Sequence, residues 1–300
     1  MIFRASLLLG ALFGISTCLK VGIIHMHGLD ESYDVPDHLH FKQYIEEATN
    51  IPVHLVDAFN KLSSLTPLAK QVPEILEKVK VIAAQYDKVI AVGYSQGGVI
   101  WRGMIESWDD HNVDTFISIA SPQHGIAGPP PLLKKMVPYI DNFSRTPTFY
   151  LFVYSPLGQN LAPLNYYLDP YHYERYLEHA EFFPRLNNEK GTDEEKARQK
   201  TNFLRLRKLV LVGGPDEDAL RPRESAQFGY YNERGNRDNV VIPMEETRFY
   251  QEDLFGLRSL DERGGVVVCT VEGPRHVEFR DDQTVMDRCV VSAVRDLVGK

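Results

Sequence analysis

The sequence is poor in cysteine, in net positive charge and in long hydrophobic runs. Its 300 residues include 3 cysteines, too few for a disulfide-rich scaffold or a cysteine-rich zinc module. With 33 basic against 41 acidic residues the net charge is −8, which argues against a nucleic-acid partner, because phosphates attract basic surfaces. No stretch reaches the roughly 20 apolar residues that span a bilayer, so we expect no transmembrane segment. The remaining composition, 43% hydrophobic and 25% charged, is that of an ordinary globular protein.

The first 18 residues have the pattern of a secretory signal peptide. Arg4 precedes an apolar run over residues 5–15, and three small residues follow at 16–18. A buried N-terminal strand or helix is the alternative interpretation. The signal interpretation predicts a soluble mature protein, residues 19–300, in the secretory pathway or outside the cell. No glycine- and serine-rich linker or internal repeat divides that length, so we expect a single domain.

An oxidising compartment changes how two other features are interpreted. Cys269 and Cys289 are an even pair that can form a disulfide there, with two buried free thiols as the alternative. Asn142 begins the sequence Asn-Phe-Ser, an acceptor site for N-linked glycosylation.

Short apolar runs alternate with stretches of helical periodicity along the chain. Strands are expected at residues 21–25, 89–92, 115–119, 209–212 and 266–271, and helices at 70–85, 97–108 and 284–297. This alternation is typical of an α/β fold with a mostly parallel sheet. Residues 123–208 break the rhythm. They are rich in proline and tyrosine and end in a charged surface run at 187–200, so we expect a lid-like insertion there.

The sequence GYSQGG, residues 93–98, lies between an expected strand and an expected helix. A Gly-x-Ser-x-Gly sequence in that position is typical of a nucleophile elbow, where the serine occupies a strained turn between strand and helix. An ordinary turn is the alternative. Ser95 is therefore the candidate nucleophile.

A serine nucleophile needs a base, an acid and donors for the oxyanion. His276 lies in a Gly-Pro loop after the last expected strand, which suits the base. Asp216, Glu217 and Asp218 follow the strand at 209–212, and any of them can supply the acid. The backbone of Gln96 and the loop at 27–29 are placed to supply the oxyanion donors.

Two features could instead indicate metal binding. Residues 215–218 are rich in carboxylates, but they lack the glycine and terminal glutamate of an EF-hand loop. His25 and His27 share one face of a strand, but no third ligand is evident nearby. We therefore expect neither a metal nor an organic cofactor.

Several separated segments resemble the palmitoyl-protein thioesterase family, and more closely its type 2, lysosomal branch. They include HGLD (27–30), GYSQGG (93–98), DDHNVDTFISIASPQHG (109–125), NYYLDPYHYERYL (165–177) and LVLVGGPD (209–216). The resemblance covers nearly all of the chain after the signal segment. It implies an α/β-hydrolase fold and a lysosomal enzyme that cleaves the thioester of a long-chain fatty acid from cysteine or coenzyme A.

The resemblance also implies roles for individual residues. Ser95 and His276 match the nucleophile and base, Leu29 and Gln96 match the oxyanion positions, and Cys269 and Cys289 match a cysteine pair that brackets the histidine. The branch pattern Pro-Asp-Asp-Gly has its second aspartate as the acid, and in ungapped register that position is Glu217 here. The family's Trp-His before Asp-Pro is replaced by Tyr167-Leu168, a departure within the acyl-binding region.

The sequence thus predicts a serine hydrolase that acts on long-chain acyl thioesters through an acyl-enzyme. A carboxylesterase or lipase on the same fold is one alternative. A non-catalytic lumenal protein that binds lipid is another, because the acid position departs from the family pattern. The sequence identifies no partner protein.

Overall fold

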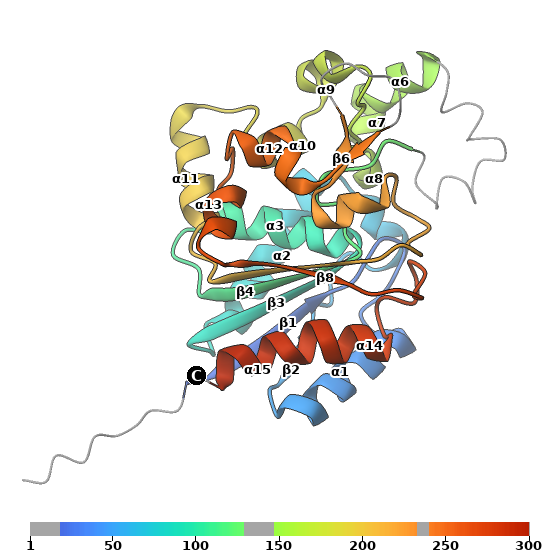
Figure 1. Ribbon diagram of the computed structural model, residues 1–300. Helices are drawn as coiled ribbons and strands as arrows, with labels where there is room; N and C mark the ends of the chain where they lie inside the picture. The colour runs from blue at the N-terminus through green and yellow to red at the C-terminus, as the bar shows by residue number, and fades with distance from the viewer. Residues whose placement is uncertain (1–18, 129–146, 233–239, 300) are drawn as a thin grey trace, which may run out of the picture.

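The computed structural model describes residues 19–128, 147–232 and 240–299 (Figure 1). Its centre is a 6-stranded sheet in the order β2-β1-β3-β4-β5-β8, and every neighbouring pair is parallel. The strands are β1 (Val21–Met26), β2 (Val53–Leu55), β3 (Lys88–Tyr94), β4 (Val113–Ile119), β5 (Lys208–Gly213) and β8 (Val266–Thr270). The expected α/β architecture is confirmed, with β2 as an additional short strand. The expected signal segment and Asn142 lie outside the described residues.

The inner strands β1, β3, β4 and β5 are buried on both faces, which explains why they are continuous apolar runs in the sequence, whereas the edge strand β8 is partly exposed. Side chains alternate between the faces along each strand. In β3, Val89 and Ala91 pack into one hydrophobic cluster, while Ile90 and Val92 pack into the other. The sheet therefore separates two hydrophobic layers, each closed by helices.

Helices cover the two faces in separate groups (Figure 1). One face carries α1 (Pro36–Thr49) and a C-terminal helix made of α14 (Gln283–Val285), the π-helical stretch η4 (Met286–Val291) and α15 (Ser292–Val298). The opposite face carries α2 (Leu68–Ala83) and α3 (Gln96–Ser107). The helices expected at 70–85, 97–108 and 284–297 are all present.

The segment between β4 and β5 forms a helical layer above α3 (Figure 1). Its described part holds α6 (Pro147–Val153), α7 (Pro156–Gln159), α8 (Ala162–Asn165), α9 (Tyr173–His179), α10 (Phe182–Leu186) and α11 (Asp193–Phe203). The run at 187–200 is expected to be charged surface, and much of it is α11, whose exposed face carries those charges. A capping box between Thr192 and Glu195 starts this helix.

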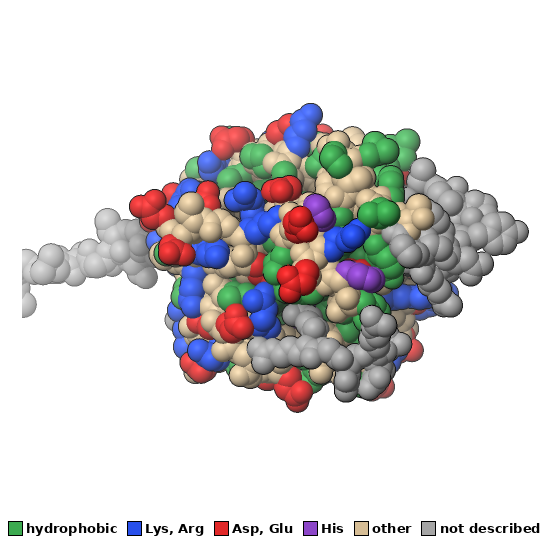
Figure 2. All heavy atoms as spheres, turned by 90° about the horizontal axis from the view of Figure 1, so that it is seen from above, with side chains coloured by type: hydrophobic (Ala, Val, Ile, Leu, Met, Phe, Trp, Pro, Cys, Tyr) green, Lys and Arg blue, Asp and Glu red, His purple; other side chains and the backbone are tan. Residues whose placement is uncertain are grey.

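Shorter elements complete the chain: η1 (Lys61–Leu65), η2 (Arg223–Gln227), β6 (Tyr230–Tyr231), β7 (Val241–Ile242), η3 (Met244–Glu246), α12 (Arg248–Gln251) and α13 (Leu257–Glu262). Seen from above, acidic and basic side chains intermingle over α12 and α9, and hydrophobic side chains gather toward α6 and α7 (Figure 2). In the part of the chain that the structure describes, no helix is both long and apolar enough to cross a bilayer.

Candidate active site

The candidate site residues all follow strands of the central sheet. Leu29 comes after β1, Ser95 after β3, Glu217 after β5 and His276 after β8. Parallel strands end at the same edge of their sheet, so these four segments meet there. The fold thus brings together residues that are up to 247 positions apart, from Leu29 to His276.

Ser95 occupies a sharp turn between β3 and α3. Its backbone has φ 51° and ψ −124°, a region that non-glycine residues rarely adopt. A Cβ atom on Gly93 would lie 2.5 Å from the Cα of Gly98, and one on Gly97 would lie 2.4 Å from the carbonyl oxygen of Met26. Both glycines are therefore required for this turn to pack against β1 and α3, as expected of a nucleophile elbow.

A continuous series of hydrogen bonds runs from Ser95 to an acidic side chain. Ser95 Oγ lies 2.9 Å from His276 Nε2, and His276 Nδ1 lies 2.7 Å from Glu217 Oε2. The other carboxylate oxygen of Glu217 accepts the backbone N–H groups of Ala219, at 2.6 Å, and Leu220, at 3.1 Å. Because Glu217 is only 5% exposed and both of its oxygens are engaged, its orientation toward the imidazole is fixed.

The three consecutive carboxylates have different partners in the loop that carries His276. Asp216 accepts the backbone N–H of Gly273 at 2.8 Å. Asp218 accepts the backbone N–H of His276 at 3.1 Å and pairs with Arg275. Of the three, Glu217 is the one that contacts the imidazole ring. The family register predicts Glu217 with the two aspartates as alternatives, and this geometry also favours Glu217.

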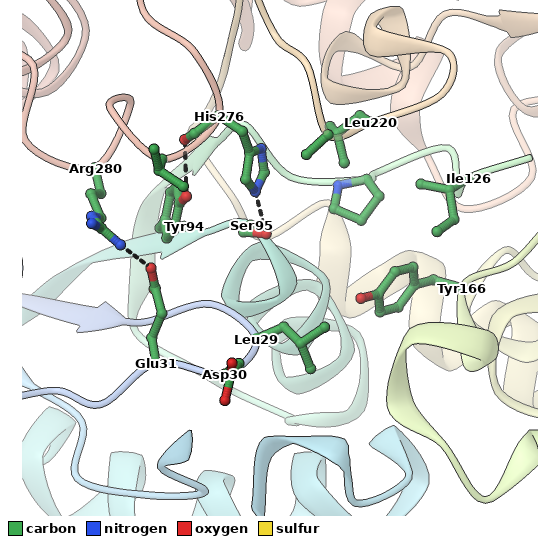
Figure 3. Close-up of a pocket in the computed structure, with 13 residues that line it drawn as sticks. Leu29, Asp30, Glu31, Tyr94, Ser95, Ile126, Tyr166, Leu220, His276 and Arg280 are labelled. Carbon is green, nitrogen blue, oxygen red and sulfur yellow. Dashed lines mark hydrogen bonds and ion pairs between the residues drawn. The ribbon is translucent and has the colours of Figure 1, made fainter. Parts of the chain in front are cut away.

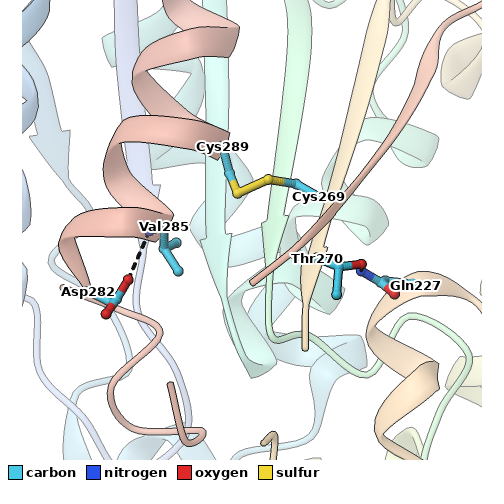
Figure 4. The surroundings of a disulfide bond; sticks show 6 residues. All are labelled: Gln227, Cys269, Thr270, Asp282, Val285 and Cys289. Atoms are coloured by element: carbon cyan, nitrogen blue, oxygen red, sulfur yellow. Dashed lines mark hydrogen bonds between the residues drawn. A yellow bond between two sulfur atoms is a disulfide. The ribbon is translucent and has the colours of Figure 1, made fainter. Parts of the chain in front are cut away.

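Contacts other than those with residues 216–218 also hold the segment around His276 in place. Cys269 on β8 and Cys289 in η4 form a disulfide with a Cα–Cα distance of 6.0 Å (Figure 4). The hydroxyl of Tyr94, the last residue of β3, donates to the carbonyl oxygen of His276 at 2.9 Å. Burial, the largest influence, raises the pKa of Tyr94 well above its ordinary value, so this hydroxyl stays protonated as a donor.

The two expected oxyanion donors belong to residues close to Ser95, one next to it in the chain and one in the lining of the same cavity. Gln96 is the first residue of α3, where a backbone N–H has no acceptor within its own helix. Leu29 lines the cavity beside Ser95. The carbonyl group of Gly28 belongs to the same peptide unit as the N–H of Leu29, and it is hydrogen-bonded to Nδ1 of His27 at 2.9 Å. This contact fixes the plane of the peptide that presents the Leu29 amide.

A cavity of about 360 Å³ opens over Ser95 and His276. Figure 3 shows that its two sides differ in chemistry. On one side of Ser95 lie Ile126, Tyr166 and Leu220, and on the other lie Glu31 and Arg280. The cavity therefore has an apolar end and a charged end, with the serine between them.

The alternative metal sites are not assembled. Nε2 of His25 contacts Nδ1 of His38 at 3.0 Å, while both ring nitrogens of His27 contact backbone carbonyl oxygens. The carboxylates of Asp216 and Asp218 bind backbone N–H groups and an arginine. Within residues 19–128, 147–232 and 240–299, no group of three histidine, cysteine, aspartate or glutamate side chains is arranged to hold a metal ion.

Sequence reasoning missed three side chains beside the candidate nucleophile. Tyr94 directly precedes Ser95 but belongs to a strand, where an aromatic residue has an ordinary packing role. Glu31 and Arg280 are 249 positions apart, yet they form an ion pair at the charged end of the cavity. No local motif marks such a pair, so only the fold reveals it.

The chain matches the family model described as palmitoyl protein thioesterase over residues 22–276. It is 40% identical to the lysosomal thioesterase PPT2-B of Xenopus laevis, covering 88% of each chain. It is 37% identical to the lysosomal thioesterase PPT2 of Homo sapiens, covering 89% of this chain and 86% of that one. Among solved structures, the carboxylesterase CesB of Bacillus subtilis aligns with a TM-score of 0.47 at 14% identity, over 93% of this chain and 84% of that one. With a family match across most of its length, this chain belongs to the palmitoyl protein thioesterase family.

Proposed function

We propose that this protein is a serine thioesterase that hydrolyses long-chain fatty acyl thioesters, such as S-palmitoyl cysteine or palmitoyl-CoA, through an acyl-enzyme. The observation that carries this proposal is the hydrogen-bonded series Ser95–His276–Glu217 at the floor of a cavity with one apolar end. Membership of the palmitoyl protein thioesterase family supports a thioester as the scissile bond.

In the first half of the reaction Ser95 Oγ attacks the thioester carbonyl carbon, and Nε2 of His276 takes the hydroxyl proton. The carboxylate of Glu217 holds the Nδ1–H tautomer, which leaves Nε2 free to accept that proton. It also stabilises the imidazolium that forms. The tetrahedral intermediate then collapses, the C–S bond breaks, and Nε2 gives its proton to the departing thiolate, which leaves a neutral His276 and an acyl-serine. In the second half, Nε2 removes a proton from water as the water oxygen attacks the acyl carbon, and it passes that proton to Ser95 Oγ as the fatty acid leaves.

The negative charge on the carbonyl oxygen is stabilised by the backbone N–H groups of Gln96 and Leu29. Such donors act mainly in the transition state, because they are aimed at charge that the ground state lacks. The Ser95 oxygen also lies at the N-terminal end of α3, where the helix dipole favours negative charge. The thiol leaves as a thiolate more readily than an alcohol leaves as an alkoxide, because its pKa is lower.

The acyl chain occupies the apolar end of the cavity in this proposal. Ile126 and Leu220 line it together with Tyr166, which follows α8 of the insertion (Figure 3). Apolar surface removed from water contributes roughly 25 cal/mol per Å², so a long acyl chain gains most of its affinity there. The thiol-bearing part of the substrate then faces the charged end.

We also propose a lysosomal location for the mature protein. The relatives from Xenopus laevis and Homo sapiens are named lysosomal thioesterases. The expected signal peptide over residues 1–18 and the sequon at Asn142 agree with this route. Expression in animal cells followed by N-terminal sequencing and glycosidase treatment tests both features, and an intact Met1 without glycan contradicts the route.

The direct test compares palmitoyl-CoA hydrolysis by the secreted protein with that of its Ser95→Ala variant. We expect turnover by the wild-type protein and a loss of at least about a thousandfold in the variant, since the nucleophile is removed. A fluorophosphonate probe should label the wild-type protein and leave Ser95→Ala unlabelled.

The two alternatives make different predictions in the same assays. A carboxylesterase hydrolyses an oxygen ester of equal chain length faster than the thioester. A non-catalytic lipid-binding protein retains an acyl ligand but shows neither turnover nor labelling of Ser95. Either result contradicts the thioesterase proposal.

A further inference from the structure

Glu31 is a largely buried carboxylate beside the candidate nucleophile, and the proposed reaction gives it no direct role. It follows Leu29 by two positions in the loop after β1, and its side chain is 13% exposed. In Figure 3 it lies with Arg280 on the side of Ser95 opposite the apolar residues. Burying a carboxylate is costly unless its oxygens are paired, so its contacts need an explanation.

The first contact joins Glu31 to the oxyanion loop itself. Its Oε2 accepts the backbone N–H of Gly28 at 3.0 Å. Gly28 packs directly on the nucleophile, because a Cβ atom built on it would lie 3.0 Å from the Cβ of Ser95. Glu31 thus fixes the backbone immediately before the Leu29 amide, at the point where the loop touches Ser95.

The remaining contacts join Glu31 to two other segments. Its Oε1 pairs with Arg280, which follows His276 by four positions and also pairs with Asp37 at the start of α1. Its Oε2 also contacts Nε2 of His38 at 3.1 Å, within α1. One carboxylate therefore connects the oxyanion loop, the first helix and the segment after the catalytic histidine.

The electrostatic setting keeps this carboxylate ionised. Burial alone would raise the pKa of Glu31. The hydrogen bond and charge of His38, then the charge of Arg280 and the N–H of Gly28, outweigh burial and lower the pKa to about 2. The contacts with Gly28 and Arg280 therefore persist in acidic as well as neutral solution.

We propose that Glu31 is a positioning residue for the oxyanion hole. It holds the Gly28–Leu29 backbone against Ser95, and its ion pair with Arg280 aligns this loop with the segment that carries His276. The inference rests on the proposed function, because it assigns Glu31 an effect on the oxyanion of that reaction. A donor that is preset in the correct orientation requires no reorganisation when charge develops on the carbonyl oxygen.

The test compares kcat and KM for palmitoyl-CoA in Glu31→Leu, Glu31→Gln and a matched control, Glu46→Gln. Glu46 lies on the same helix as Asp37, accepts the backbone N–H of Val53 at 2.8 Å and pairs with Lys42, but it has no contact with the oxyanion loop. It therefore reports what the loss of a similar carboxylate does to the fold alone. Thermal unfolding of each variant shows whether it is folded.

We expect Glu31→Leu to lower kcat about 10- to 100-fold with KM changed less than about twofold, because misaligning one oxyanion donor costs somewhat less than deleting it. Glu31→Gln should lower kcat about 3- to 10-fold, since its amide oxygen can still accept the Gly28 N–H but the ion pair with Arg280 is lost. Glu46→Gln should keep kcat within about twofold. This order of kcat values at constant KM is not expected from a general loss of stability.

Folded Glu31→Leu with kcat within about twofold of the wild type overturns the proposal. A raised KM at unchanged kcat also overturns it, because Glu31 then acts in ground-state binding. If Glu31→Leu fails to fold, Glu31→Gln decides by the same criteria. A wild-type protein that cleaves only oxygen esters contradicts the proposed function, yet the kcat comparison on the ester still decides the role of Glu31. A wild type that cleaves neither substrate overturns both.

Discussion

Glu217→Gln should nearly abolish turnover, because the local hydrogen bonds force the new amide into one orientation. Glu217 Oε1 accepts two backbone N–H groups, from Ala219 and Leu220. Only the oxygen of a glutamine side chain can take that position, so its NH2 group must face Nδ1 of His276. The ring then carries its proton on Nε2, which points at Ser95 and can no longer accept a proton. The corresponding aspartate-to-asparagine change in a serine protease with this triad lowers kcat by about 10⁴, and we expect a loss of about 10³ to 10⁴ here.

The neighbouring carboxylates provide matched controls. Asp218→Asn keeps an oxygen for the backbone N–H of His276 but loses an exposed ion pair with Arg275. Such a pair contributes at most about 1 kcal/mol, so kcat should fall by no more than about fivefold. Asp216→Asn keeps an oxygen for the N–H of Gly273 and should change kcat less than about threefold.

The assay is steady-state hydrolysis of palmitoyl-CoA, with thermal unfolding to confirm that each variant is folded. Equal losses at Asp216, Glu217 and Asp218 would refute the reasoning, because they would show that the turn acts as a whole. Retention of more than about a tenth of wild-type kcat by Glu217→Gln would refute it as well, because the tautomer argument allows no such activity.

Three further predictions concern the surroundings of the site. Gly97→Ala places a methyl group 2.4 Å from the carbonyl oxygen of Met26. We therefore expect kcat to fall more than about tenfold and Tm to drop by several degrees. A variant with wild-type kcat and wild-type Tm would contradict the packing argument. Replacing Cys269 and Cys289 by serine opens a 20-residue loop and should cost about 3 kcal/mol in urea unfolding, a difference that a reducing agent should remove. The pKa of Glu31 falls from 4.5 to about 2 on folding, so its ionised form stabilises the protein above about pH 4.5 and that contribution is lost as the pH falls toward 2. The unfolding free energy lost in Glu31→Gln should therefore be at most about 3 kcal/mol at about pH 5 and should shrink below about pH 4.5; a loss that grows in acid would show the opposite sign.

The long elements of the fold could be predicted because their patterns are repeated over many residues. The strands are β-branched runs, and α2 has apolar residues at helical spacing along 16 residues. The helices of the insertion escaped prediction because α7 and α8 have 4 residues each, too few for a period to be visible. α11 was predictable in principle, since Thr192 and Glu195 have the spacing of a capping box.

The residues of the candidate site also divide into those that a local sequence pattern marks and those that only the packing of distant segments brings together. Ser95 and His276 could be singled out because each lies within five residues after the end of an expected strand, where the fold exposes side chains at the sheet edge. The acid could be assigned to Glu217 only through the register of the family pattern, since the three adjacent carboxylates differ otherwise only in which way their side chains point. Glu31 and Arg280 escaped notice because their contact is created by the packing of segments far apart in the chain.

The adjacent hydrogen bonds and ion pair between residues 216–218 and 273–276 determine how these two segments separate during local unfolding. Each carboxylate binds a different group of the histidine loop. Asp216 binds the Gly273 amide and Glu217 binds the imidazole, while Asp218 binds the His276 amide and the Arg275 side chain. If only the contact between the imidazole and Glu217 broke, the buried carboxylate would lose that partner, while the contacts of Asp216 and Asp218 would still hold the loop in place. The two segments are therefore expected to open and close as one cooperative unit, so that hydrogen exchange at the Gly273 and His276 amides proceeds with a common opening free energy.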